Sequence, residues 1–418
     1  MNNTADSLDA TEALGMADGS LISEPISGAS GSHTASMGTA EHTSAPPLIC
    51  LSHLRWGFVF QRPQHLMTRF AAERAVYFFE EPVHHDGAPH LHIDRSDASG
   101  VVVATPHLPH GFDPDLVEPT VRELLDRMIA DEGIGEFVLW YYTPMALGFS
   151  DHLTPLATVF DCMDELSMFK GAPPMLLDRE KELFRRADLV FTGGESLYES
   201  KRTQHPHVSC FASSIDREHF AKARTITSEP EDQRSIGHPR LGFFGVIDER
   251  MDIELIAEVA RLRPEWHLVM IGPVVKIDPA ALPQAPNIHF IGGKSYAELP
   301  EYLAGWDITI LPFAMNDSTR FISPTKTPEY LAGGKPVIST PIRDVVRPYG
   351  EKGLVSIAAT AEEFVAAGDE ILANGGDRSA WLAEVDTFLA RSSWNNVWSA
   401  MRSQIEEVAG ARRAAGNN

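Results

Sequence analysis

The segment from Arg320 to Ser339 combines residue types that could bind a diphosphate. Ser323-Pro324 or Thr327-Pro328 supplies an N-cap residue followed by a proline at the first helical position, so we expect a helix to begin here. The unpaired backbone amides at a helix start bind anions, and Lys326 would add a full positive charge beside them. Glu329 would lie one turn further along, where a carboxylate can accept hydrogen bonds from two vicinal ribose hydroxyls. The alternative is a plain helix start with a solvated lysine.

Three acidic residues follow an apolar run in the first half of the chain. Asp161, Asp164 and Glu165 come directly after Ala157–Phe160, at the carboxyl end of an expected strand. Clustered carboxylates can bind a divalent cation, and they can also accept hydrogen bonds from substrate hydroxyls. Helix capping by Asp164 is the alternative.

A glycine and an arginine lie close together after the first apolar run, Leu48–Leu51. Gly57 would let the backbone approach a ligand closely, and Arg62 could reach a cleft beyond the strand. The alternative is a structural one, in which Trp56 and Phe58 pack in a wall between domains.

The elements that must position these residues are predicted from apolar runs that alternate with helix-like segments. Helices are expected at Gln64–Glu73 and Leu116–Ile129. Buried strands are expected in the first half at Leu48–Leu51, Val76–Phe79, Val101–Ala104, Phe137–Trp140, Ala157–Phe160 and Leu189–Phe191. This alternation is typical of an open, mostly parallel sheet with helices on both faces.

A polar stretch, residues 223–238, interrupts the alternation and is predicted to be an interdomain linker. The alternation restarts with a strand at Leu241–Phe244 and a helix at Asp252–Leu262. Further strands are expected at His267–Ile271, Asn287–Ile291, Ile308–Leu311 and Pro336–Ser339. The predicted fold class is therefore α/β, with two doubly wound Rossmann-like domains over residues 46–222 and 239–390. In such folds ligands bind beyond the carboxyl ends of the strands, so the cleft between the domains is the expected site.

The chain has 418 residues and a formal net charge of −23, which argues against a protein that coats nucleic acid or an anionic membrane. Residues 1–45 contain six acidic residues and no Lys or Arg, and we predict a disordered tail because they cannot bury enough apolar area. This segment has the composition of neither a secretory signal nor a transit peptide. The three widely spaced cysteines are typical of reduced thiols, so we expect a cytoplasmic protein.

The run Pro324-Thr-Lys-Thr-Pro-Glu-Tyr-Leu-Ala-Gly-Gly-Lys-Pro-Val337 resembles the donor loop of GT-B glycosyltransferases, particularly those of the retaining family 4. In that family a helix N-terminus binds the diphosphate of a sugar nucleotide, and a glutamate holds the ribose. The resemblance therefore implies that Pro324, Thr325, Lys326 and Glu329 bind the donor. It spans roughly residues 48–400 and includes Trp56–Leu66, Asp161–Leu166, Ala187–Thr192, Gly245–Asp252 and Gly292–Pro300.

The resemblance also implies roles for other residues of the second domain. The strand end at Gly245 passes close to the diphosphate in similar enzymes, where a side chain would obstruct the ligand. An arginine usually follows this glycine, but here Val246 does, so Arg250 becomes the candidate phosphate partner or only decorates a helix start. Lys294 and Tyr296 follow the strand that frames the nucleotide base in similar enzymes, where a backbone contact and a ring stack are expected. The alternative is a capped surface helix with Tyr296 in the core.

Further implications concern the first domain and the donor sugar. Similar enzymes use the loop carrying Gly57 and Arg62 near the donor phosphates and acceptor, and we take Arg62 and Asp161 as the candidate catalytic residues. GT-B enzymes generally work without a metal, so no metal or other cofactor is expected. Many family members also have a glutamate eight residues before the ribose glutamate, a position that Phe321 occupies here. The role of that acid would then pass to a neighbour: Asn316, Asp317, Ser318 or Arg320.

The sequence thus predicts a glycosyltransferase that moves a sugar from a nucleoside-diphosphate sugar to an acceptor hydroxyl, with retention implied by the family alone. The acceptor is expected in the first domain, and residues 391–418 should contain a helix that crosses back to it. A saccharide or lipid-linked acceptor in bacterial polysaccharide or glycolipid synthesis fits this family, as does peripheral contact with the inner face of the membrane. The alternative is a non-catalytic GT-B protein that binds a nucleotide sugar or acts as a scaffold. A dinucleotide-dependent oxidoreductase is disfavoured because Leu48–Gly57 lacks the G-x-G-x-x-G pattern.

Overall fold

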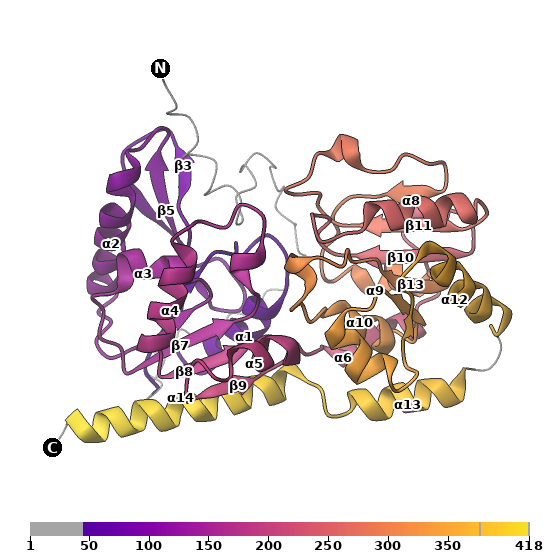
Figure 1. Ribbon diagram of the computed structural model, residues 1–418. Coiled ribbons are helices and arrows are strands. Elements are labelled where there is room, and N and C mark those ends of the chain that lie inside the picture. Colours follow the sequence, from indigo (N-terminus) through magenta and orange to yellow (C-terminus); the bar gives the residue numbers. More distant parts are fainter. Residues whose placement is uncertain (1–44, 376–377, 417–418) are drawn as a thin grey trace, which may run out of the picture.

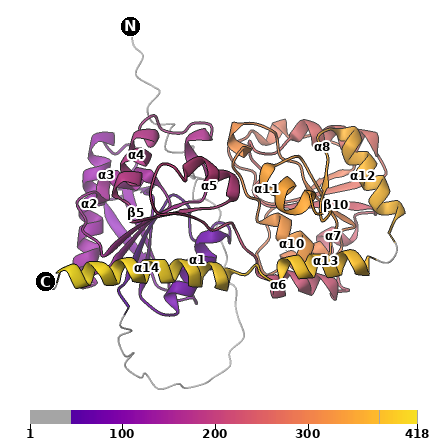
Figure 2. The ribbon, with the colours of Figure 1, turned by 60° about the horizontal axis from the view of Figure 1, so that its bottom comes forward.

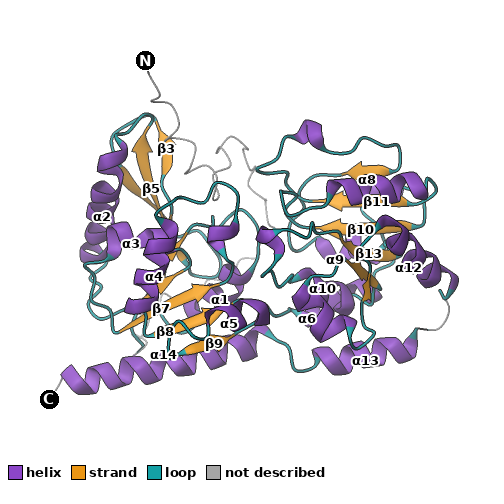
Figure 3. Ribbon diagram, viewed as in Figure 1, coloured by secondary structure: helices purple, strands orange, loops and turns teal. Residues whose placement is uncertain are grey.

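The computed structural model describes residues 45–375 and 378–416. The predicted disordered tail, residues 1–45, lies outside the described residues except for its last position. Within them the chain forms two α/β domains side by side (Figure 1). Each domain has one largely parallel sheet enclosed by helices (Figure 3), which confirms the predicted fold class.

The sheet of the N-terminal domain has nine strands in the order β3-β5-β2-β1-β6-β7-β8-β9, with β4 paired to β5. Among the described residues, the β4–β5 pair is antiparallel and the other pairs of this sheet are parallel. The strands are β1 (Leu48–Ser52), β2 (Val76–Glu80), β3 (Val83–His85), β4 (His90–Asp94), β5 (Val102–Pro109), β6 (Val138–Tyr141), β7 (Ala157–Cys162), β8 (Leu189–Thr192) and β9 (Val208–Cys210). Strands β3, β4 and β9 were not expected, because none of them has a continuous apolar run and β3 and β9 are only three residues long.

Helices cover both faces of this sheet, because successive side chains of a buried strand point to opposite faces. Ile49 and Leu51 of β1 pack in one apolar cluster with α2 and α4, whereas Leu48 and Cys50 pack in another with α1. The helices of this half are α1 (Arg62–Ala71), α2 (Pro114–Asp131), α3 (Leu147–Ser150), α4 (Leu176–Arg186) and α5 (Glu195–Lys201). Helix α6 (Arg217–Ala221) follows them in the chain but packs on the C-terminal domain, where Phe220 lies in the apolar core.

The sheet of the C-terminal domain has six parallel strands in the order β12-β11-β10-β13-β14-β15. They are β10 (Arg240–Phe244), β11 (His267–Ile271), β12 (Ile288–Phe290), β13 (Ile308–Leu311), β14 (Val337–Ser339) and β15 (Ser356–Ile357). The surrounding helices are α7 (Glu231–Arg234), α8 (Ile253–Leu262), α9 (Leu299–Ala304), α10 (Lys326–Ala332), α11 (Arg343–Val345), α12 (Ala361–Ala373) and α13 (Ser379–Leu389).

The segment predicted as a linker, residues 223–238, is instead packed against the C-terminal domain. Arg224 forms a bidentate ion pair with Asp386, with N–O distances of 2.7 and 3.0 Å. Gln233 is fully buried and accepts a hydrogen bond from the indole of Trp306 at 2.8 Å. The polar composition suggested a free linker because buried partners for these polar side chains could not be seen in the sequence.

A long helix, α14 (Trp394–Gly416), leaves the C-terminal domain and lies along the N-terminal domain (Figure 2). Its buried residues Trp394, Met401 and Ile405 belong to the same apolar cluster as α1. The crossing helix expected within residues 391–418 is therefore present over the described part of that range. Among the described residues, no helix combines the length and apolar character needed to cross a lipid bilayer.

Candidate active site

A cavity of about 570 Å³ lies between the two domains, beyond the carboxyl ends of β1, β10 and β11. The N-terminal domain contributes the loop Trp56–Gln61, and the C-terminal domain contributes loop residues and the start of α10. The predicted donor-binding residues that line it are Gly57, Gly245, Arg250, Lys294, Tyr296, Thr325, Lys326 and Glu329. Pro324 lines a different cavity of about 560 Å³ together with Ser323.

Helix α10 places Lys326 and Glu329 at this cavity, but its start differs from both predicted caps. The N-cap is Thr325, which makes no side-chain capping hydrogen bond, so neither Ser323 nor Thr327 caps the helix. Pro328 is tolerated in the first turn because a backbone N–H would have no intrahelical partner there.

Lys326 and Glu329 shift each other's pKa at the wall of this cavity. Glu329 is 8% exposed, and burial raises the pKa of its carboxyl to about 8, while the charge of Lys326 acts in the opposite direction. Burial also lowers the pKa of Lys326, which the charge of Glu329 opposes. An anion bound beside Lys326 would stabilise its protonated form, because opposite charges favour ionisation.

Gly245 and Gly272 leave the space that the side chain of Lys326 occupies at the cavity. A Cβ at Gly245 would lie 2.7 Å from Nζ of Lys326, and Gly245 has a φ of +143°, which favours glycine. Gly272, after β11, has a φ of +145°, and a Cβ there would clash with the backbone oxygen of Gly245. Sequence reasoning missed Gly272, although the strand–Gly–Pro pattern of Ile271-Gly272-Pro273 resembles the strand end at Gly245.

Arg250 reaches the cavity while it is held by a neighbouring carboxylate. Its Nε lies 2.9 Å from Oδ1 of Asp248, and its Nη2 lies 2.6 Å from Oδ2. Asp248 is buried, so this pair fixes the plane of the guanidinium. Nη1 of Arg250 makes no hydrogen bond among the described residues, which leaves a donor for an anion in the cavity.

At the wall of the cavity, the amine of Lys294 and the ring of Tyr296 already have partners, whereas the buried hydroxyl of Tyr296 has no hydrogen-bond partner among the described residues. Nζ of Lys294 lies 2.6 Å from Oδ2 of Asp232. Tyr296 stacks on His219, with ring centroids 4.4 Å apart, and its ring also contacts Phe60 of the N-terminal domain at 4.7 Å. The position of Tyr296 agrees better with a packing role than with a free face for a base.

Arg62 and Asp161, expected at the cleft as catalytic residues, form a buried ion pair instead. Nε and Nη2 of Arg62 lie 2.9 and 2.8 Å from the two carboxylate oxygens, and Nη1 donates to the carbonyl oxygen of Phe211 at 2.7 Å. Their side chains are 1% and 0% exposed, and neither lines the interdomain cavity. Asp161 lies near the end of the buried strand β7, where an unpaired carboxylate would be costly. Arg62, the first residue of α1, neutralises this charge.

The other two acids after β7 have separate environments. Glu165 is buried with Lys201, which also contacts Glu180 at 3.0 Å. Asp164 is half-buried, and burial raises the pKa of its carboxyl to about 6, while the charges of Arg250, Arg62 and Lys326 lower it. Among these three acids, Asp164 is therefore the one whose pKa is lowered by the charges of Arg250 and Lys326, which line the cavity.

Phe321, which replaces the acid of many similar enzymes, makes an apolar contact across the domains. Although it precedes α10 in the C-terminal domain, it packs against the apolar cluster that contains Ile49 and Leu51. Phe60, from the other domain, was not singled out by the sequence and is 41% exposed at the cavity.

The C-terminal domain can be compared with known families. Residues 238–374, which include Gly245, Lys326 and Glu329, match the family described as Glycosyl transferases group 1. Residues 238–374 therefore form a group 1 glycosyltransferase domain. Of the enzyme classes considered from the sequence, the match favours sugar transfer over a dinucleotide-dependent oxidoreductase. It agrees with the resemblance of the donor loop.

Relatives extend the likeness to both domains of the glycosyltransferase. The putative teichuronic acid biosynthesis glycosyltransferase TuaH of Bacillus subtilis is 25% identical over 318 residues, which are 70% of this chain and 77% of TuaH. Sucrose-phosphate synthase from Thermosynechococcus elongatus superposes with a TM-score of 0.65 at 14% identity, over 88% of this chain and 100% of that one. Anabaena HepE in complex with UDP gives 0.58 at 11% identity, over 87% and 100%. These structures show the fold, which is GT-B. The family match and the likeness to TuaH show that the chain is a glycosyltransferase.

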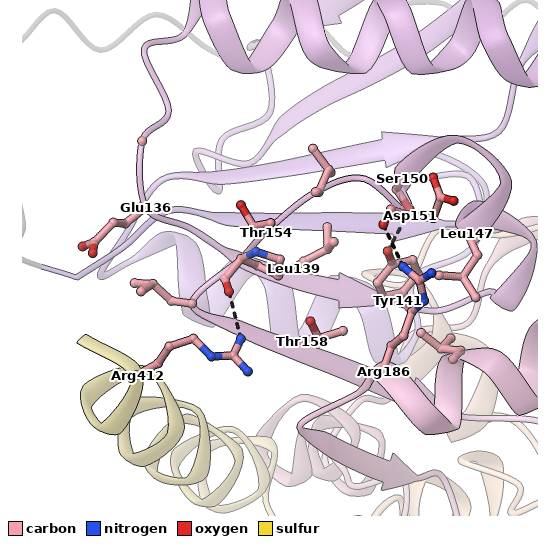
Figure 4. A pocket seen from close by; sticks show the side chains of 15 residues that line it. Glu136, Leu139, Tyr141, Leu147, Ser150, Asp151, Thr154, Thr158, Arg186 and Arg412 are labelled. Atoms are coloured by element: carbon pink, nitrogen blue, oxygen red, sulfur yellow. Dashed lines mark hydrogen bonds between the residues drawn. The ribbon is translucent and has the colours of Figure 1, made fainter. Parts of the chain in front are cut away.

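A second cavity of about 570 Å³ lies in the N-terminal domain, between β6, β7, α4 and the end of α14 (Figure 4). Its arginines are already partnered: Arg186 donates to the carbonyl oxygen of Asp151 at 2.7 Å, and Arg412 donates to that of Pro155 at 2.9 Å. The residues predicted to bind the donor do not line it, so the interdomain cavity is the candidate active site of the glycosyltransferase.

Proposed function

We propose that this glycosyltransferase transfers a sugar from a nucleoside-diphosphate sugar to a hydroxyl of a saccharide or lipid-linked acceptor, with retention of configuration. The observation that carries the proposal is the placement of Lys326 and Glu329 on α10 at the interdomain cavity. The name of TuaH supports an acceptor in polysaccharide synthesis, and the UDP complex of HepE supports a nucleotide ligand.

The cations of the cavity would act on the leaving group. Charge develops on the nucleoside diphosphate as its bond to the sugar breaks, and preorganised donors stabilise such charge strongly in a site without bulk water. Lys326 and the unpaired Nη1 of Arg250 are placed to supply these donors. Glu329 would hold the ribose, and closure of the cleft would keep water from hydrolysing the donor.

We further propose that the reaction needs no metal, because Lys326 and Arg250 can neutralise the diphosphate themselves. The acceptor would enter from the N-terminal domain, and a lipid-linked acceptor would bring the protein to the inner face of the membrane from the cytoplasm.

A donor panel tests the proposed function. Purified full-length protein is titrated calorimetrically with UDP, GDP and ADP, and is then incubated with the sugar nucleotides of the one that binds. We expect one nucleotide to bind and one of its sugars to be hydrolysed slowly or transferred, with and without EDTA. If no nucleotide binds and no donor is consumed, the proposed function is wrong.

The raised pKa of Glu329 predicts a pH dependence. The carboxylate form accepts hydrogen bonds from both ribose hydroxyls, so nucleotide affinity should rise as the pH increases through about 8. It should fall again at higher pH, when Lys326 loses its proton. Calorimetry from pH 7 to 10.5, the ordinary pKa of a lysine, checks this, and Glu329→Gln should abolish the rising limb while keeping the fall. An identical rising limb in the variant would assign the titration to another group.

A further inference from the structure

A buried carboxylate of the C-terminal domain binds the start of a helix in the N-terminal domain. Asp344, in α11, is 6% exposed, and Ser196 is the second residue of α5. The backbone N–H of Ser196 donates to Oδ1 of Asp344 at 3.0 Å and to Oδ2 at 3.4 Å, and Oγ of Ser196 also donates to Oδ1. Asp344 therefore does for α5 what an N-cap side chain does within one chain segment.

Helix α5 lacks a cap of its own because the other domain approaches too closely. Its N-cap is Gly194, and a Cβ at this position would lie 2.6 Å from Cβ of Ser323 and would also meet the carboxylate of Asp344. The donor loop, taken here as Phe321–Val337, includes Ser323, which lies three residues before Lys326. The glycine thus allows the donor loop to rest directly on the start of α5.

The donor loop has a second contact with the N-terminal domain. Phe321 packs against the apolar cluster of that domain, two residues before Ser323. The segment between Phe321 and Lys326 is therefore anchored on the N-terminal domain at one end and enters the cavity at the other. The exposed ion pairs of Glu199 with Arg343 and Arg347 lie at the same interface, but water screens them.

We propose that Asp344 is a positioning residue of the transfer reaction, which fixes the donor loop relative to the acceptor-side domain through Ser196 and Gly194. This inference rests on the proposed function. The groups that would bind the diphosphate, Lys326 and Arg250, belong to the C-terminal domain, whereas the acceptor would be held by the N-terminal one. A misplacement of about 1 Å between reacting groups can cost about 100-fold in rate.

The test compares turnover with nucleotide affinity in the full-length protein. For Asp344→Ala we expect kcat for transfer to fall by about 10- to 100-fold. The Kd for the nucleotide that binds the wild type, whether UDP, GDP or ADP, should stay within about twofold, because its partners are unchanged. Asp344→Asn keeps an oxygen that accepts from the N–H of Ser196, so it should recover most of the kcat. A merely structural role would lower Tm without this split between kcat and Kd.

Two further variants keep the result interpretable. Gly194→Ala adds one methyl group at the interface and should lower kcat in the same way without removing a polar partner. Glu199→Ala removes the exposed ion pairs and should leave kcat within about twofold of the wild type. If wild-type protein turns over a donor and both Asp344→Ala and Gly194→Ala retain its kcat, the positioning role is refuted. If the wild type binds no nucleotide, the proposed function itself fails, and the positioning role fails with it.

Discussion

Replacing Asp161 with alanine is expected to lower the free energy of unfolding by about 3–5 kcal/mol, the usual cost of breaking a buried ion pair by removing one partner. The guanidinium of Arg62 would remain buried at 1% exposure, and among the described residues the carbonyl oxygen of Phe211 would be its one remaining acceptor. Urea unfolding, followed by tryptophan fluorescence at constant pH, measures the change.

Two controls separate this effect from a general loss of charge. Asp178→Ala removes a surface carboxylate that pairs with Lys181, and the free energy of unfolding should stay the same within experimental error. The double variant Arg62→Met with Asp161→Leu should recover most of the lost stability, because no unpaired charge remains buried. If Asp161→Ala unfolds at the same urea concentration as the wild type but loses all turnover, Asp161 acts in catalysis, as the sequence alone suggested.

Lys326→Met is expected to weaken binding of the nucleotide by about 10- to 150-fold, which corresponds to the 1.5–3 kcal/mol of a hydrogen bond to a charged group. Methionine is similar in length and has no charge, so the variant removes the ammonium, which lies 5.9 Å from the ring centroid of Phe243, and keeps an apolar stem beside Gly245. Titration calorimetry with UDP, GDP or ADP, whichever binds the wild type, gives the ratio of Kd values.

Lys294→Met is the matched control, because it removes a cation that lines the same cavity. Its amine is already paired with Asp232, so Kd should change by no more than about threefold. If Lys294→Met abolished nucleotide binding and Lys326→Met left it unchanged, the assignment of the donor site to α10 would be wrong.

Much of the fold could be predicted because its central strands are buried on both faces. Such strands appear as continuous apolar runs, as in β1 and β11, and the turns between them are polar. Strand β4 escaped prediction because its histidines alternate with Leu91 and Ile93 on a half-exposed sheet edge. Residues 223–238 were predicted to be a linker because they are polar. In the structure Gln233 of this segment is buried and hydrogen-bonded to Trp306.

The candidate site could be predicted where the chemistry is local in sequence. Lys326 and Glu329 are three residues apart on one helix, so their common position follows from helix geometry. Partner choice over long sequence separations could not be predicted: Arg62 and Asp161 are 99 positions apart, and both carry the residue types expected of a catalytic cleft. The capping of α5 by Asp344 likewise depends on how the two domains meet.

A crystal structure of the protein with its bound nucleotide tests the central claim most directly. We expect the nucleotide in the cavity between the domains, with a diphosphate oxygen within hydrogen-bond distance of Nζ of Lys326 and both ribose hydroxyls on Glu329. A nucleotide bound elsewhere, with Lys326 and Glu329 free of ligand, would contradict the account.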